Sequence, residues 1–172
     1  MTEIKKEMRR RDALKVLGCG TCAITAIASG CTFSELYSDF EGEAVDVDLS
    51  DAAYQALQTI GEMVAIDVGP VKLNLIRTDE ATLVAIERIC PHLGEDMAPI
   101  GSAPNARGLY MDGQLWCTAH GSKFDVQGMP LGGPSNTPIQ AFPVEFNPEE
   151  SGGTATVYVG VAPPEGNTDE GA

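Results

Sequence analysis

Two short segments of the chain contain residue types that could bind a metal centre. The first segment reads Cys90-Pro91-His92-Leu93-Gly94, and the second reads Cys117-Thr118-Ala119-His120-Gly121-Ser122. His92 and His120 are the only histidines in the 172-residue sequence. Each segment therefore offers one thiolate and one imidazole, a donor set that suits zinc or an iron–sulfur cluster.

The spacing of these donors favours a cluster but leaves a structural zinc module as the alternative. Zinc sites commonly pair cysteine with cysteine and histidine with histidine, whereas each segment here carries one of each. A two-iron cluster with two imidazole ligands is less negative than a four-cysteine cluster, so its potential is higher, roughly −150 to +300 mV. Gly94 and Gly121 would let backbone N–H groups approach sulfur. The Ser122 hydroxyl, just past His120, could donate to a bridging sulfide.

Both segments resemble the two cluster loops of Rieske iron–sulfur proteins. The likeness continues through Lys123-Phe124-Asp125, and Gly132-Gly133-Pro134 resembles the proline loop that covers the cluster in that family. It extends from about Val45 to Gly160. The resemblance implies one [2Fe-2S] cluster per chain, with one iron held by Cys90 and Cys117, the other held by His92 and His120, and Ser122 hydrogen-bonded to the cluster.

Two positions depart from the pattern of the Rieske subunits found in cytochrome bc complexes. Those subunits often carry an extra cysteine in each loop, joined as a disulfide, and the corresponding positions here are Glu95 and Ala119. Phe124 stands where high-potential members keep a tyrosine, and phenylalanine has no hydrogen-bond donor. Fewer donors to sulfur stabilise the reduced cluster less. We therefore expect a potential below that of members with both the serine and the tyrosine.

The residues around the two segments predict an all-β domain that presents them at hairpin tips. Strands are expected over residues 44–49, 63–68, 71–77, 82–88, 139–146 and 154–161, with a hairpin over 109–116 around Asp112-Gly113. A short helix is expected over residues 52–57, capped by Ser50 or Asp51, and loops over residues 128–138 and 148–153. Trp116 and Met97 are expected in the core and Lys123 on an exposed loop. The predicted architecture is a small antiparallel β-sandwich or barrel with a Rieske cluster-binding subdomain formed by two hairpin loops.

The N-terminal residues predict an export signal. Arg10-Arg11-Asp12-Ala13-Leu14-Lys15 resembles a twin-arginine motif and precedes an uncharged run over residues 16–34. Ala28-Ser29-Gly30-Cys31 resembles a lipobox, which leaves a lipoprotein and an uncleaved signal anchor open; an ordinary amphipathic helix is the other reading. The expected organisation is signal or anchor over 1–31, tether over 32–43, Rieske domain over 44–161 and disordered acidic tail over 162–172.

The acidic composition narrows the expected partners. The formal net charge is −14, and the basic residues after position 31 are Lys72, Arg77, Arg88, Arg107 and Lys123. Such a surface disfavours nucleic acid and favours a basic partner such as a c-type cytochrome. The alternative is that the charge serves solubility in general or a salty habitat, and net charge alone does not choose between these readings.

The resemblance implies one-electron transfer, and the twin-arginine pattern predicts that the chain is exported by that machinery to the outer, periplasmic face of the cytoplasmic membrane. The leading hypothesis is the iron–sulfur subunit of a quinol–cytochrome c oxidoreductase-like complex. The alternatives are the small subunit of an exported molybdenum oxidase of the arsenite-oxidase kind and a free-standing Rieske ferredoxin. An aromatic-ring oxygenase would need an iron site with two further histidines, which this sequence does not contain. The chain is thus expected to be an electron-transfer subunit of an oxidoreductase rather than a catalyst by itself.

Overall fold

The computed structural model describes residues 37–149 and 152–164. The chain divides into two units, Met1–Ser38 and Asp39–Ala172, and the fold described below is that of the second. The expected twin-arginine motif, the lipobox at Cys31, residues 32–36 of the expected tether and most of the expected tail lie outside the described residues. Within the described part of the chain, no helix has the length and apolar character needed to span a membrane.

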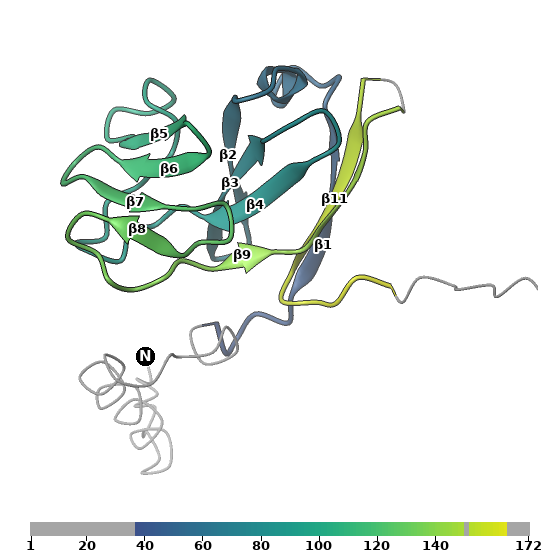
Figure 1. Ribbon diagram of the computed structural model, residues 1–172. Coiled ribbons are helices and arrows are strands. Elements are labelled where there is room, and N and C mark those ends of the chain that lie inside the picture. Colours follow the sequence, from purple (N-terminus) through teal and green to yellow (C-terminus); the bar gives the residue numbers. More distant parts are fainter. Residues whose placement is uncertain (1–36, 150–151, 165–172) are drawn as a thin grey trace, which may run out of the picture. The chain divides into compact units, whose positions relative to one another are not determined.

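The structure consists of three antiparallel sheets (Figure 1). The first has the order β1 (Glu43–Asp48), β11 (Thr154–Val159) and β10 (Val144–Asn147). The second has the order β2 (Met63–Val68), β3 (Val71–Arg77), β4 (Leu83–Glu87) and β9 (Ala141–Phe142). The third has the order β5 (Gly108–Met111), β6 (Gln114–Cys117), β7 (Ser122–Phe124) and β8 (Pro130–Gly132). The predicted all-β antiparallel fold is therefore confirmed.

The first two sheets form a base, and residues 89–138 form a subdomain inserted into it. The chain leaves the base after β4 and returns at β9, and these two strands are neighbours in one sheet, with Ala85 opposite Phe142. The Glu87 N–H donates to the Gln140 carbonyl at 2.7 Å, which closes the neck of the insertion. Figure 1 shows β5 to β8 on one side of β2, β3 and β4, and β1 and β11 on the other side of these strands.

One apolar core joins the subdomain to the base. Met63, Ile76 and Ile86 come from β2, β3 and β4. They pack in one cluster with buried residues of the subdomain and the segment that follows it, namely Cys90, Met97, Leu115, Cys117, Phe124 and Ile139. Both cysteines are thus placed in the dry interior by the side chains that attach the subdomain to the base.

Several predicted elements agree closely with the structure. β2 and β3 have the predicted bounds. The hairpin of β5 and β6 turns at Asp112 and Gly113, whose φ values of 54° and 75° are those of a type I′ turn.

Three predictions about local structure are wrong. In place of the helix expected over residues 52–57, the structure has a short 3-10 helix, Gln55–Gln58, and its N-cap residue Tyr54 makes no side-chain cap. Neither Ser50 nor Asp51 caps it; the Asp48 carboxylate instead accepts from the Ser50 N–H in the preceding turn. The strand expected over residues 139–146 is split at Pro143, which has no N–H, so β9 and β10 belong to different sheets. The expected loop over residues 128–138 contains β8, with a bulge opposite Lys123 and Phe124.

Candidate metal centre

The first loop, residues 90–95, is a closed turn between β4 and the segment that follows. Ile89 forms a bridge with Asp96, and the Cys90 N–H donates to the Glu95 carbonyl at 2.9 Å. The Gly94 N–H donates to the Cys90 carbonyl at 2.9 Å, and Gly94 has a φ of 74°, which favours glycine. The fold therefore buries Cys90 at the foot of the loop and leaves Leu93, 67% exposed, at its tip.

The second loop is the turn between β6 and β7. Cys117 and Ser122 are paired across the two strands, and the Gly121 N–H donates to the Cys117 carbonyl at 2.8 Å. Gly121 adopts a φ of 84°, so this tight turn also requires glycine. Cys117 is buried and His120 is exposed, the same arrangement of foot and tip as in the first loop.

The structure brings the four predicted donors together in two pairs. The thiol of Cys117 lies in hydrogen-bond contact with that of Cys90, and both are free thiols in the buried interior. The imidazole rings of His92 and His120 have centroids 4.9 Å apart and meet edge to face. The two pairs follow the arrangement that the resemblance implies, in which one iron takes sulfur ligands and the other takes nitrogen ligands.

Burial raises the pKa of the Cys117 thiol to about 11, and the hydrogen bond with Cys90 acts in the same direction. Backbone N–H groups of Ala119 and His120 point at this sulfur and oppose the rise in pKa. These two donors come from the turn that Gly121 closes. They would stabilise negative charge on the sulfur of a bound metal centre.

A two-iron cluster fits this donor set better than a single metal ion does. His92 Nδ1 is buried and has no hydrogen-bond partner among the described residues; a bound metal would satisfy this atom. Two sulfur ligands for one iron and two nitrogen ligands for the other form the donor set that a histidine-ligated two-iron cluster uses.

The side chains around the thiols make a dry enclosure. Phe124, Met97 and Leu115 are at most 1% exposed and pack in the same core cluster as Cys90 and Cys117. The expectation that Met97 lies in the core is confirmed. Phe124 brings no donor to this enclosure, so backbone N–H groups and Ser122 must supply the hydrogen bonds to sulfur.

Ser122 and the Gly132-Gly133-Pro134 segment lie against the second loop. The buried Ser122 hydroxyl oxygen accepts from the Ser135 N–H at 3.3 Å, which leaves its own hydrogen available to donate. Gly133 is so close to the second loop that a Cβ there would lie 2.2 Å from the Gly121 carbonyl oxygen. The segment thus covers this loop, as the resemblance to a proline loop implies.

Trp116 and Lys123 do not have the predicted environments. Trp116 is half-buried rather than in the core, and its indole Nε1 is enclosed without a partner among the described residues. Lys123 lies within β7 rather than on a loop, with Nζ 3.6 Å from the centroid of the Trp116 ring. These two side chains pack on each other across the outer face of the strand pair.

Sequence reasoning missed three polar residues that fasten the first loop: Asn74, Arg88 and Asp96. Asn74 is fully buried in β3 and donates from Nδ2 to the Met97 carbonyl at 2.7 Å. Arg88 follows β4 and pairs with Asp96 at 2.9 Å. The available signal was Asn74 itself, a polar residue between Leu73 and Leu75 in β3.

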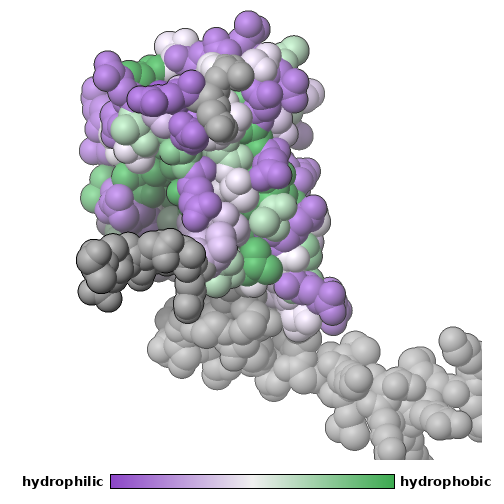
Figure 2. All heavy atoms as spheres, turned by 90° about the vertical axis from the view of Figure 1, so that its right-hand side faces the viewer, coloured by the Kyte–Doolittle hydropathy of each residue, from purple (hydrophilic) through white to green (hydrophobic). Residues whose placement is uncertain are grey.

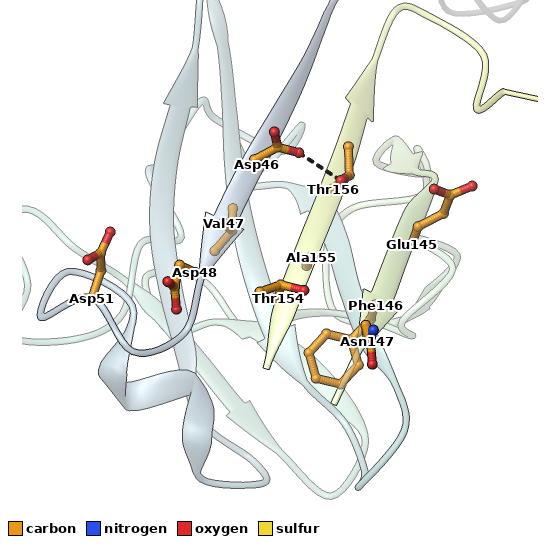
Figure 3. A pocket seen from close by; sticks show the side chains of 10 residues that line it. All are labelled: Asp46, Val47, Asp48, Asp51, Glu145, Phe146, Asn147, Thr154, Ala155 and Thr156. Atoms are coloured by element: carbon orange, nitrogen blue, oxygen red, sulfur yellow. Dashed lines mark hydrogen bonds between the residues drawn. The ribbon is translucent and has the colours of Figure 1, made fainter. Parts of the chain in front are cut away.

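Charge is distributed unevenly between the base and the subdomain. The described residues of the base carry thirteen Asp or Glu against Lys72, Arg77 and Arg88, whereas residues 89–138 carry four acidic and two basic residues. A groove of about 520 Å³ runs along β1, β11 and β10, and Asp46, Asp48, Asp51 and Glu145 contribute carboxylates to it (Figure 3). Figure 2 shows a face of the base on which hydrophilic side chains predominate.

Comparisons with known proteins give a family match and a set of similar folds. The family model described as "Rieske [2Fe-2S] domain" matches residues 49–143, more than half of the chain. No curated protein matches the chain. A solved structure of the complex of reduced oxygenase and oxidised ferredoxin in carbazole 1,9a-dioxygenase is 24% identical, covers 57% of this chain and 90% of its own, and has a TM-score of 0.46.

Two further solved structures are similar at the level of the fold. The ferredoxin of carbazole 1,9a-dioxygenase from Nocardioides aromaticivorans IC177 is 21% identical, covers 60% of this chain and 88% of its own, and has a TM-score of 0.46. Dicamba monooxygenase bound to dicamba is 18% identical, covers 72% of this chain and 35% of its own, and has a TM-score of 0.48.

Proposed function

The chain belongs to the Rieske [2Fe-2S] domain family, and from this premise we propose that Cys90 and Cys117 hold one iron while His92 and His120 hold the other. One [2Fe-2S] cluster per chain follows from the family. The observation that carries the ligand set is the division of the four side chains into a buried thiol pair and an imidazole pair whose centroids are 4.9 Å apart. Ser122 is proposed to donate its free hydroxyl hydrogen to the cluster.

The protein transfers single electrons, which is the chemistry that the bound cluster supplies. The residues of the chain determine where that electron enters and leaves. Phe124, Met97 and Leu115 exclude water from the thiol side, whereas His120 is exposed on the imidazole side. Leu93 adds an exposed apolar side chain beside His92. Exchange of electrons with a partner is therefore proposed to occur at the imidazole tips.

We propose that the electron passes to a redox partner protein. We propose the outer face of the cytoplasmic membrane as the location, reached by twin-arginine export, and a quinol-oxidising membrane complex as the assembly. The apolar tip formed by Leu93 supports a donor or partner with an apolar binding surface. The carboxylates of the base support a basic acceptor such as a c-type cytochrome.

A second assembly is supported by the twin-arginine pattern combined with a compact single Rieske unit. In this alternative the chain is the small electron-transfer subunit of an exported molybdenum oxidase. Co-purification from a native membrane extract separates the two: a cytochrome b subunit supports the first proposal, and a molybdopterin-containing large subunit supports the second. Isolation of the chain alone, fully loaded with cluster, contradicts both and supports a free-standing carrier.

The ligand set is tested by spectroscopy of the isolated protein. Two iron and two acid-labile sulfide per chain, together with a Rieske-type EPR signal after reduction, are expected. His92→Ala and His120→Ala should each abolish that signal, whereas the control Trp116→Phe should keep it because Trp116 packs on Lys123 outside the thiol enclosure. A colourless, EPR-silent protein with one zinc ion would refute the proposal.

A further inference from the structure

A buried arginine holds together the two legs of the first loop. Arg88 lies two residues before Cys90, and its side chain is 9% exposed. Its Nε donates to Asp96 Oδ1 at 2.9 Å, and Asp96 is the residue at which the loop returns. Its Nη1 donates to the Ile66 carbonyl at 3.1 Å and pairs with Asp67 Oδ1 at 2.8 Å. The guanidinium therefore fixes the outgoing leg, the returning leg and β2 relative to one another.

The returning leg is held at successive residues. The Asp96 carboxylate that binds Arg88 also accepts from the Ala98 N–H at 2.9 Å. Between these two residues, the Met97 N–H donates to the Arg88 carbonyl at 2.7 Å, and the Met97 carbonyl accepts from Asn74 Nδ2 at 2.7 Å. Because the Asp96 side chain is 32% exposed, its position depends on these partners rather than on tight burial.

The same leg is bonded to the segment that holds the second loop. The Asp96 carbonyl accepts from the Arg107 N–H at 2.8 Å. The Arg107 carbonyl in turn accepts from both the N–H and the hydroxyl of Thr118, at 2.8 Å and 2.9 Å. Thr118 directly follows Cys117, so a continuous set of hydrogen bonds runs from Arg88 through Asp96 and Arg107 to the second loop.

We infer that Arg88 and Asp96 form a positioning pair that sets the separation of the two ligand loops, and hence the geometry of the metal centre. The inference rests on the ligand set proposed above. The ion pair is only partly exposed, so losing one member leaves the other without its charged partner. Hydrogen bonds that orient metal ligands typically change metal affinity or activity by roughly 10- to 100-fold when they are removed.

The test compares two substitutions, each of which neutralises one of the two carboxylates that pair with Arg88. Asp96→Asn weakens the contact that joins the loop legs, whereas Asp67→Asn weakens the contact with β2, where the carboxylate is 55% exposed. The measurements are the rate of cluster loss to a chelator, the g-values of the reduced protein and the redox potential. We expect Asp96→Asn to lose its cluster roughly 10- to 100-fold faster with altered g-values, and Asp67→Asn to stay within about twofold of the unmodified protein.

Equal behaviour of the two variants, whether both are normal or both are impaired, would overturn the inference. Arg88→Lys provides a further arm because it keeps the charge but cannot reach Asp96, Asp67 and the Ile66 carbonyl together; retention of the cluster at the normal rate would also overturn it. In cluster-free protein, hydrogen exchange at the Ala98 and Thr118 amides should be faster in Asp96→Asn than in Asp67→Asn, and equal rates would count against the pair. An unmodified protein without any cluster would instead refute the proposed function.

Discussion

The contact between Gly133 and the second loop makes the most specific prediction, because it separates a steric effect from a backbone effect. In Gly133→Ala, the new Cβ would lie 2.2 Å from the Gly121 carbonyl oxygen and 2.6 Å from Ser122 Cα. Backbone rather than a flexible side chain is in the way, so the covering segment and the second loop must separate by about 1 Å to reach ordinary contact.

Two neighbouring glycines provide matched controls. Gly133 and Gly121 both have a φ of 84°, but a Cβ on Gly121 meets nothing within 4 Å. A Cβ on Gly132 also meets nothing within 4 Å, and Gly132 does not have a positive φ. Alanine at a positive φ costs about 1–2 kcal/mol, and overpacking typically adds about 1–3 kcal/mol. The expected losses are thus about 2–5 kcal/mol for Gly133→Ala, about 1–2 kcal/mol for Gly121→Ala and within about 0.5 kcal/mol for Gly132→Ala.

Urea unfolding followed by far-UV circular dichroism gives the free energy of unfolding of each cluster-loaded variant. The EPR spectrum of the reduced protein shows whether the second loop has moved. We expect altered g-values in Gly133→Ala and unchanged ones in Gly132→Ala. If Gly133→Ala were no less stable than Gly121→Ala and had the normal spectrum, the proposed contact between the covering segment and the second loop would be wrong.

Two further predictions concern the thiol enclosure. Phe124→Tyr should raise the redox potential by about 20 to 60 mV, because the new hydroxyl would donate to sulfur and a hydrogen bond of about 0.5–1.5 kcal/mol corresponds to this shift at about 59 mV per factor of ten. A redox titration measures the shift, and Phe146→Tyr, on the base, is the control. An unchanged or lower potential would contradict the expectation. In cluster-free protein, the raised pKa of Cys117 means that the folded state keeps a proton that the unfolded state loses, so the free energy of unfolding should fall as the pH rises from about 9 to about 11. Urea titrations across that range check the sign. Cys117→Ala should make the decline smaller, while the raised pKa values of Tyr110 and Tyr158 leave part of it in place. A free energy that rises with pH would refute the expectation.

The agreement between sequence and structure is best where a local physical rule decides the conformation. β2 and β3 were predictable because apolar side chains fill them and Gly69-Pro70 must turn between them. The β5–β6 hairpin follows from Asp112-Gly113, since few other residue pairs tolerate two positive φ values. The four ligands could be proposed from the sequence because both histidines of the chain fall in the two segments that contain Cys90 and Cys117.

The misses have a different origin, because they depend on contacts between distant parts of the chain. β8 is a strand only because it pairs with β7. Its three residues, Pro130–Gly132, lie in a segment rich in glycine and proline, which gives no strand signal of its own. Pro143 interrupts what the sequence pattern presents as one strand. Because Pro143 has no N–H, β9 ends before it, and β10, which follows it, pairs in a different sheet. The roles of Arg88 and Asp96 could not be read from spacing, because both depend on where the first loop returns.

Because the chain leaves and re-enters the base at the paired strands β4 and β9, the subdomain of residues 89–138 is a topologically separate insertion. A direct turn joining Glu87 to Gln140 would convert two strands that are already paired into an ordinary hairpin, without rearranging the other strands of the base. Because both ends of the insertion are fixed by paired strands, insertions and deletions within residues 89–138 need not displace the strands of the base. Excision would expose the apolar surface of Met63, Ile76 and Ile86, and would leave the buried Asn74 amide without the Met97 carbonyl to which it donates.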